Sequence, residues 1–217
     1  MPKSPFAIQL DALQGEVSGF LKRAGFKKKG RSYNRLTTGG PIHVINFQMG
    51  EYPIGQNYVV PGLRESLYGK FAVNLGVFLP CVRKVEWQTL DPAFIQECHC
   101  TIRDRLSCLA FGKDTWFELV PDITALSGTI IQLLEQFGMP FLDTFPDYPA
   151  VISYYEVHGT LPFQNESRAS LEAALVAFHL GDTAKSKTLF LAALSADHDG
   201  FRQYVRELIN RIGIDVE

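Results

Sequence analysis

Apolar residues recur every three or four positions near the start of the chain. This spacing is typical of a helix with one face in the core, and it includes Phe6, Leu10, Leu13, Val17, Phe20 and Leu21. Ser4 followed by Pro5 is favourable for starting such a helix, and Gly25 is favourable for ending it. The pattern therefore predicts an amphipathic helix over residues 5–24.

The pattern then changes to alternation, which is typical of strands. In residues 26–36 neither side of an extended chain is apolar, so we expect a strand at or near a sheet edge, where lysines block edge-to-edge pairing. Residues 37–41 are predicted as a turn and residues 42–49 as the next strand. One side of the first strand would carry Lys27, Lys29, Arg31, Tyr33 and Arg35.

Residues 70–80 are apolar on both sides, as in a central strand. Residues 98–110 alternate like a strand, with a short helix as the alternative, and residues 116–120 would form a short edge strand. The intervening residues 81–92 are predicted as a connection, and residues 50–69, with several Gly and Pro, as a long loop of a kind that is often functional. Together these elements predict an N-terminal helix packed on a mostly antiparallel sheet of four or five strands.

Beyond Pro121 the hydrophobic period becomes helical. Residues 160–167 resemble a linker. The fold class is therefore α+β, with an α+β domain over residues 1–145 and a helical C-terminal subdomain over residues 146–217 that contains a helical hairpin. The predicted helices cover residues 122–137, 148–158, 168–180, 183–195 and 200–212.

Charge is distributed unevenly along the 217 residues, whose net charge is −2. Residues 1–70 hold ten Lys and Arg against four Asp and Glu, while the remaining residues hold eleven against nineteen. No apolar run reaches the ~20 residues of a membrane helix, and the first residues do not resemble a signal peptide. We therefore expect a cytoplasmic protein without a membrane partner, whose four cysteines are reduced.

The basic run at residues 27–35 is the first candidate site. Lys27, Lys29, Arg31 and Arg35 would form a cationic stripe for phosphates, with Tyr33 available for stacking. The alternative, which we favour, is a solvated edge strand. His43 on the neighbouring strand is a candidate general base, although a hydrogen-bonded structural histidine is the more common case.

Arg103 and Arg105 are the second candidate, because two arginines on one side of a strand can bind carboxylate or phosphate. Cys98, His99 and Cys100 invite a zinc interpretation, but no second close pair supplies further ligands, and buried thiols are the better explanation. No phosphate-binding glycine loop, nucleophile elbow or paired-carboxylate motif is present. We expect no metal, no cofactor and no catalytic residue, and we lean against an enzyme.

Four segments carry a resemblance to a known family: LKRAGFKKKGRSYNR (21–35), HVINFQ (43–48), FAVNLGVFLP (71–80) and CHCTIRDRLSCL…DTWFEL (98–119). Together they resemble an uncharacterised bacterial family that carries a domain-of-unknown-function label. The resemblance covers about residues 8–140 and leaves out residues 160–217. It implies no catalytic residues, because none is established for that family.

Two functional hypotheses follow. The first is a non-catalytic cytosolic binding protein, by analogy an immunity-type inhibitor of a toxin partner. Its acidic residues would face a basic protein; the alternative is that they are ordinary solvated side chains: Asp143, Asp147, Glu156, Glu166, Glu172 and Asp182. The second hypothesis is a nucleic-acid- or phosphate-acting protein that uses the basic hairpin.

Overall fold

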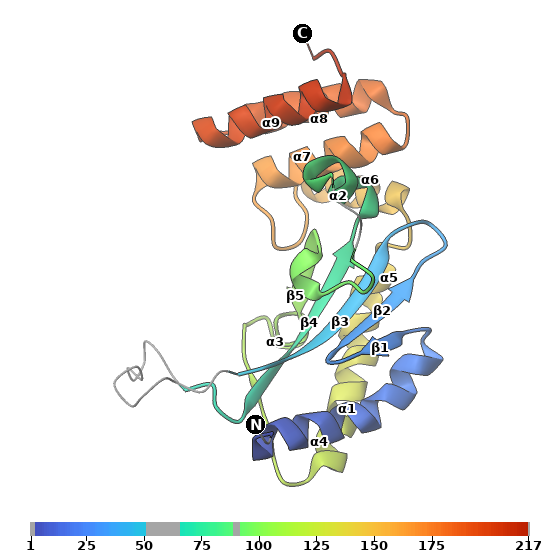
Figure 1. The fold of residues 1–217 in the computed structure, drawn as a ribbon, viewed down its shortest axis with the longest axis vertical. Coiled ribbons are helices and arrows are strands. Elements are labelled where there is room, and N and C mark those ends of the chain that lie inside the picture. The colour runs from blue at the N-terminus through green and yellow to red at the C-terminus, as the bar shows by residue number, and fades with distance from the viewer. Residues whose placement is uncertain (1–2, 51–65, 89–91, 217) are drawn as a thin grey trace.

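The computed structural model describes residues 3–50, 66–88 and 92–216, and it confirms the α+β class (Figure 1). Helix α1 (Pro5–Arg23) begins where predicted, because the Ser4 side chain accepts a hydrogen bond from the Ala7 amide and Pro5 opens the first turn. Its buried face carries Leu10, Leu13, Gln14, Val17, Ser18 and Leu21.

The sheet has the strand order β1-β2-β3-β4-β5, with β6 also paired to β4. Every strand pair is antiparallel. The central position predicted for residues 70–80 is confirmed, because β4 pairs with β3 on one side and with β5 and β6 on the other. The strands are β1 (Lys27–Lys29), β2 (Ser32–Leu36), β3 (Ile42–Met49), β4 (Lys70–Phe78), β5 (Ile102–Arg105) and β6 (Phe117–Glu118).

The predicted single strand over residues 26–36 is wrong. The chain turns at Gly30, whose φ of 60° is in the left-handed region that glycine tolerates, and it returns as β2. Lys28 therefore pairs with Tyr33, while Lys27 and Lys29 pair with Asn34 and Ser32. Because paired residues share a face, Lys27 and Lys29 lie on the opposite face from Tyr33 and Arg35, and the predicted stripe does not exist.

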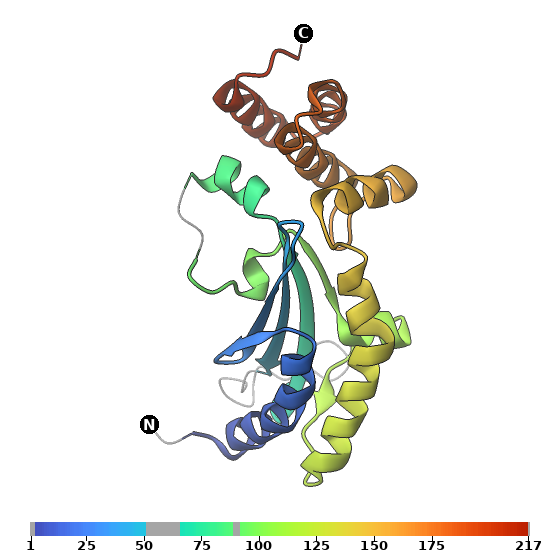
Figure 2. The ribbon, with the colours of Figure 1, turned by 90° about the vertical axis from the view of Figure 1, so that its right-hand side faces the viewer.

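The two faces of the sheet are covered differently (Figure 2). One face packs against α1 and against the continuous helical run of α4 (Ile123–Leu133), η3 (Leu134–Gly138) and α5 (Met139–Asp143). The other face carries a polar row across five strands. In register, this row consists of Lys29, Ser32, Asn46, Asn74 and Arg105.

Two connections contain helices that the sequence analysis missed or only offered as an alternative. Residues 81–92, predicted as a connection, begin with helix α2 (Pro80–Trp87). Residues 98–110, predicted as one strand, consist of the end of η2 (Glu97–His99), strand β5, and most of α3 (Leu106–Phe111). The predicted long loop at residues 50–69 lies largely outside the described residues.

The C-terminal helices follow the prediction closely. They are α6 (Tyr148–His158), α7 (Glu166–His179), α8 (Thr183–Leu194) and α9 (Asp199–Ile212). The helix expected to end at Gly138 instead continues to Asp143, because Gly138 has right-handed helical dihedrals, with φ of −71° and ψ of −46°; a Cβ there would lie 3.0 Å from Leu134 Cδ2. Helix α2 packs against α7 and α9, although it belongs by sequence to the first region (Figure 1). The boundary between residues 145 and 146 stays a prediction.

Candidate functional site

A polar pocket lies where α2, the segment around η2 and the start of α7 meet, and its cavity volume is about 340 Å³. We call it the arginine pocket, because Arg83 of α2, Arg103 of β5 and Arg168 of α7 all line it. These arginines come from segments that are far apart in the sequence. The fold therefore assembles a concentration of guanidinium groups that no single motif reveals.

The polar face of the sheet holds one wall of this pocket in place. The Asn34 side chain donates to the Ile95 carbonyl at 2.9 Å and accepts from the Ile95 amide at 2.8 Å. The Ser32 hydroxyl donates to Gln96 Oε1 at 2.6 Å. Gly76 allows the closest approach, because a Cβ there would lie 2.6 Å from Cys100 Sγ. The segment at residues 95–100 is thus fastened to the sheet beside Arg103.

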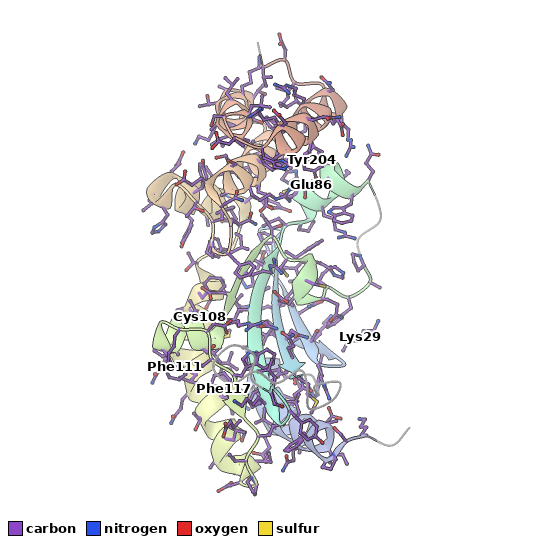
Figure 3. The ribbon with its side chains drawn as sticks, turned by 90° about the vertical axis from the view of Figure 1, so that its left-hand side faces the viewer. Lys29, Glu86, Cys108, Phe111, Phe117 and Tyr204 are labelled. Carbon is purple, nitrogen blue, oxygen red and sulfur yellow. The ribbon has the colours of Figure 1, made fainter. Side chains whose placement is uncertain are left out.

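Arg168 is fully engaged within the pocket. Its Nη1 lies 2.7 Å from Glu86 Oε1, and its Nε donates to Glu172 Oε1 at 2.7 Å. Both carboxylates are shielded from solvent, with side-chain exposures of 5% and 2%. Tyr204 of α9 donates to Glu86 Oε1 at 2.9 Å, and Figure 3 shows these two side chains meeting between their helices. This network joins α2, α7 and α9 and leaves Arg168 little capacity for a ligand.

Burial is the main cause of the shifted pKa values in this network. It raises the pKa of Glu172 to about 7, against the attraction of the Arg168 guanidinium and the hydrogen bond from Gln164. Burial, together with the neighbouring Glu86 carboxylate, raises the pKa of Tyr204 to about 12. The tyrosine therefore remains a hydrogen-bond donor over the physiological range, and the network is a structural clamp.

Arg83 and Arg103 differ from Arg168. The Nε atom of each is buried and has no hydrogen-bond partner among the described residues. Arg103 has one longer contact, from Nη1 to Glu97 Oε1 at 3.4 Å. A buried donor without an acceptor is costly, so both guanidinium groups keep unused capacity for an acceptor. These two side chains are the available cations of the pocket.

Two exposed aromatic rings flank the same arginines. The Arg83 guanidinium carbon lies 5.2 Å from the centre of the Trp87 ring, and that of Arg103 lies 4.7 Å from the centre of the Phe163 ring. Trp87 is 63% exposed and Phe163 is 76% exposed. Phe163 also has a φ of 65°, which is strained for an aromatic residue. The pocket thus combines cationic groups with exposed aromatic rings, two features that single-stranded nucleic-acid sites share.

The predicted basic hairpin does not form one site. Lys27 and Lys29 are exposed at the sheet edge, and Figure 3 shows Lys29 far from Glu86. Arg31 lies in the turn, where its Nε is 3.6 Å from Asp11 Oδ1 of α1. Tyr33 is buried, and its hydroxyl lies 2.8 Å from the Ser18 hydroxyl, so the ring is not available for stacking on a ligand.

Arg35 and His43 form a structural cluster. His43 is buried, and its Nε2 lies 2.9 Å from the Phe145 carbonyl oxygen. Arg35 donates from Nε to His43 Nδ1 at 3.3 Å and also pairs with Asp143. Nε2 therefore carries the proton, and burial lowers the pKa of His43. The candidate general base is instead a buried neutral histidine whose hydrogen bond joins β3 to Phe145, just after the end of α5.

Of the two arginines predicted on β5, only Arg103 reaches the pocket. Arg105 is held by Asp114, whose two oxygens each accept from Nη1 at 2.8 Å, and it lies 5.1 Å from the centre of the Trp116 ring. The four cysteines are unpaired, and no metal-binding group of three His, Cys, Asp or Glu occurs among the residues that the structure describes.

Sequence reasoning missed Arg83, Trp87, Phe163 and Arg168. Arg83 and Trp87 were assigned to a connection, although Pro80 followed by apolar residues at positions 81, 82 and 85 is a recognisable start for a short helix. Phe163 lay in the predicted linker. No local signal distinguishes it, because its place beside the pocket depends on the contact with Arg103.

No curated protein and no solved structure matches the chain. None of the helices in residues 3–50, 66–88 and 92–216 has the length and apolar character that crossing a bilayer requires. A family model, by contrast, matches residues 17–144, which is more than half of the 217 residues and includes Arg83 and Arg103. The chain therefore belongs to the family described as domain of unknown function DUF4304.

Proposed function

We propose that the protein is a binding protein that takes a nucleotide in the arginine pocket. The observation that carries the proposal is the pair of guanidinium groups, on Arg83 and Arg103, whose buried Nε donors have no partner in the described chain and which flank one cavity. Arginine presents two parallel donors to a phosphate, and such charge-assisted bonds are about twice as strong as neutral ones.

The aromatic rings support a nucleotide over a simple phosphate. Trp87 and Phe163 are exposed beside the same two arginines, and stacking of a base on an aromatic ring contributes about 1–3 kcal/mol. In this arrangement the phosphate would lie between the guanidinium groups and the base against one ring. The phosphate-acting alternative from the sequence analysis is thus kept, but its site moves from the basic hairpin to the arginine pocket.

The hypothesis of a toxin inhibitor rested on an acidic surface. Most of those acids have partners within the chain: Asp143 pairs with Arg35, Glu156 pairs with Lys185, and Glu172 is buried against Arg168. Asp147 and Asp182 cap the starts of α6 and α8. These roles explain the acids without a partner protein, so the inhibitor hypothesis stays a prediction, testable by co-purification of a basic protein.

The nucleotide proposal is tested by calorimetric titration with adenosine monophosphate, inorganic phosphate and adenosine at low salt. We expect adenosine monophosphate to bind more tightly than inorganic phosphate or adenosine. Only the monophosphate can contact the guanidinium groups and also stack its base on an aromatic ring. Replacing Arg83 and Arg103 together by Gln should weaken binding at least tenfold, whereas Lys113→Gln, on an exposed loop, should not.

Two results would contradict the proposal. One is the absence of monophosphate binding to the wild-type protein at millimolar ligand in low salt. The other is unchanged affinity in the Arg83→Gln/Arg103→Gln variant. Repeating the titration with cytidine, guanosine and uridine monophosphates then shows whether the pocket discriminates between bases.

A further inference from the structure

A second and larger cavity lies on the other side of α2. Its volume is about 860 Å³, and residues of α2, α7 and α9 line it together with Tyr148 at the start of α6. Ligand pockets in proteins typically measure about 300–1,000 Å³. The two cavities use opposite sides of one helix, because Cys81, Lys84 and Val85 line the second cavity whereas Val82, Arg83 and Glu86 line the arginine pocket.

The walls of the second cavity are mainly apolar. The apolar lining includes Leu175 and Phe178 of α7, Val85 of α2 and Ile212 of α9. The Cys81 thiol adds no charge to the lining, because burial raises its pKa to about 12. These residues form a surface for a hydrocarbon group, since covering apolar area contributes about 25 cal/mol per Å².

The charged groups at the cavity are all basic. Lys84 and Arg211 line it, and no Asp or Glu is present among the described residues that do so. Arg211 is held in place, because its Nη1 donates to the carbonyl oxygens of Val85 at 2.8 Å and Glu86 at 3.1 Å. Lys84 is exposed at the end of its flexible side chain. A ligand of complementary charge therefore has an anionic head and an apolar body.

We propose that this cavity binds a carboxylate with an unbranched aliphatic chain. The carboxylate would lie between Lys84 and Arg211, and the chain would cover Val85, Leu175 and Phe178. The proposal is independent of nucleotide binding, because it uses different side chains. A negative result for carboxylate binding can therefore be distinguished from a negative result for nucleotide binding.

The test is calorimetric titration with dodecanoate below its micelle concentration, compared with dodecanol and acetate. Dodecanoate should bind once per chain, dodecanol at least tenfold more weakly, and acetate not measurably at the same concentrations. Lys84→Gln should weaken dodecanoate binding about three- to tenfold, whereas Lys113→Gln should not. Val85→Phe, which narrows the cavity along the wall that the chain would cover, should weaken dodecanoate binding at least tenfold.

Control measurements keep these results interpretable. The melting temperature of Val85→Phe reports whether that variant is folded. If it is not, Lys84→Gln still tests the site, because Lys84 is exposed. The Arg83→Gln/Arg103→Gln variant should bind dodecanoate with unchanged affinity. The proposal is overturned if wild-type protein does not bind dodecanoate, if dodecanol binds equally well, or if folded Val85→Phe keeps full affinity.

Discussion

The basic hairpin and the arginine pocket both concentrate positive charge, but they use it differently. At the hairpin, Arg35 is engaged by His43 and Asp143, whereas Arg31 has only a longer contact with Asp11 at 3.6 Å, comparable to the 3.4 Å contact between Arg103 and Glu97. In the arginine pocket, Arg83 and Arg103 keep buried donors that no described residue satisfies. The lesson is that availability, not the number of cations, separates a binding site from a structural cluster.

The arginine pocket also contains a structural arginine. Arg168 lies beside Arg83 and Arg103 but is bound by two buried carboxylates. A guanidinium used in this way holds helices together, and its removal should affect folding before it affects binding. Replacing a structural arginine or histidine should therefore change stability, whereas replacing an available one should change binding.

Arg168→Met should lower the free energy of unfolding by about 3–5 kcal/mol, because it leaves Glu86 and Glu172 buried without a cation. Chemical denaturation at neutral pH measures this loss. Arg206→Met, on an exposed position of α9, is the matched control and should change stability by less than about 0.5 kcal/mol. A loss below 1 kcal/mol for Arg168→Met would show that the clamp is not structural.

Glu172 should make stability depend on pH. Its pKa rises from 4.5 to about 7 on folding, so the folded state binds this proton more tightly than the unfolded chain. The resulting stability is present below about pH 4.5 and is lost as the pH rises through 7, by up to about 3 kcal/mol. Glu172→Gln should flatten the profile between pH 5 and 7.5, whereas exposed Glu135→Gln should not. An identical slope in wild type and Glu172→Gln would refute the assignment.

His43→Leu should cost about 1–3 kcal/mol of stability, because it leaves the Phe145 carbonyl and the Nε donor of Arg35 without their partner, although Arg35 keeps Asp143. Nucleotide affinity should remain at the wild-type value. Thermal denaturation and ligand titration of the same variant decide the matter. A stable variant with lost binding would make His43 functional after all.

The Lys27→Gln/Lys29→Gln variant should have the smallest effect. Both side chains are exposed, so stability should change by no more than about 0.5 kcal/mol per residue. Nucleotide affinity should also be unchanged apart from a weak long-range effect that salt removes. Loss of nucleotide binding by this variant at physiological salt would indicate that the nucleotide binds at the basic hairpin.

Much of the fold could be predicted because its signals are local. The start of α1 depends on Ser4 and Pro5, and the central position of β4 depends on an apolar run that ends at Phe78. The β1–β2 hairpin escaped prediction because its turn rests on Gly30 within a basic run that has no apolar pattern. There, the conformation of one residue determines which side chains share a face.

The arginine pocket could be predicted only in part. Arg103 was a candidate, because two arginines alternate on one strand. Arg83 and Phe163 come from segments that were assigned to a connection and to a linker. Their meeting depends on the fastening of residues 95–100 to the sheet and on the packing of α2 against α7. Such long-range contacts leave no periodic trace in a single sequence.

The most direct test observes the arginines themselves. Nuclear magnetic resonance resolves the Nε–H signal of each arginine, and adenosine monophosphate can be added to saturation. We expect the signals of Arg83 and Arg103 to shift and their exchange with water to slow, because both donors gain an acceptor. The signal of Arg35, whose Nε already donates to His43, should not move. Shifts at Arg35 with none at Arg83 and Arg103 would contradict the distinction between available and structural cations.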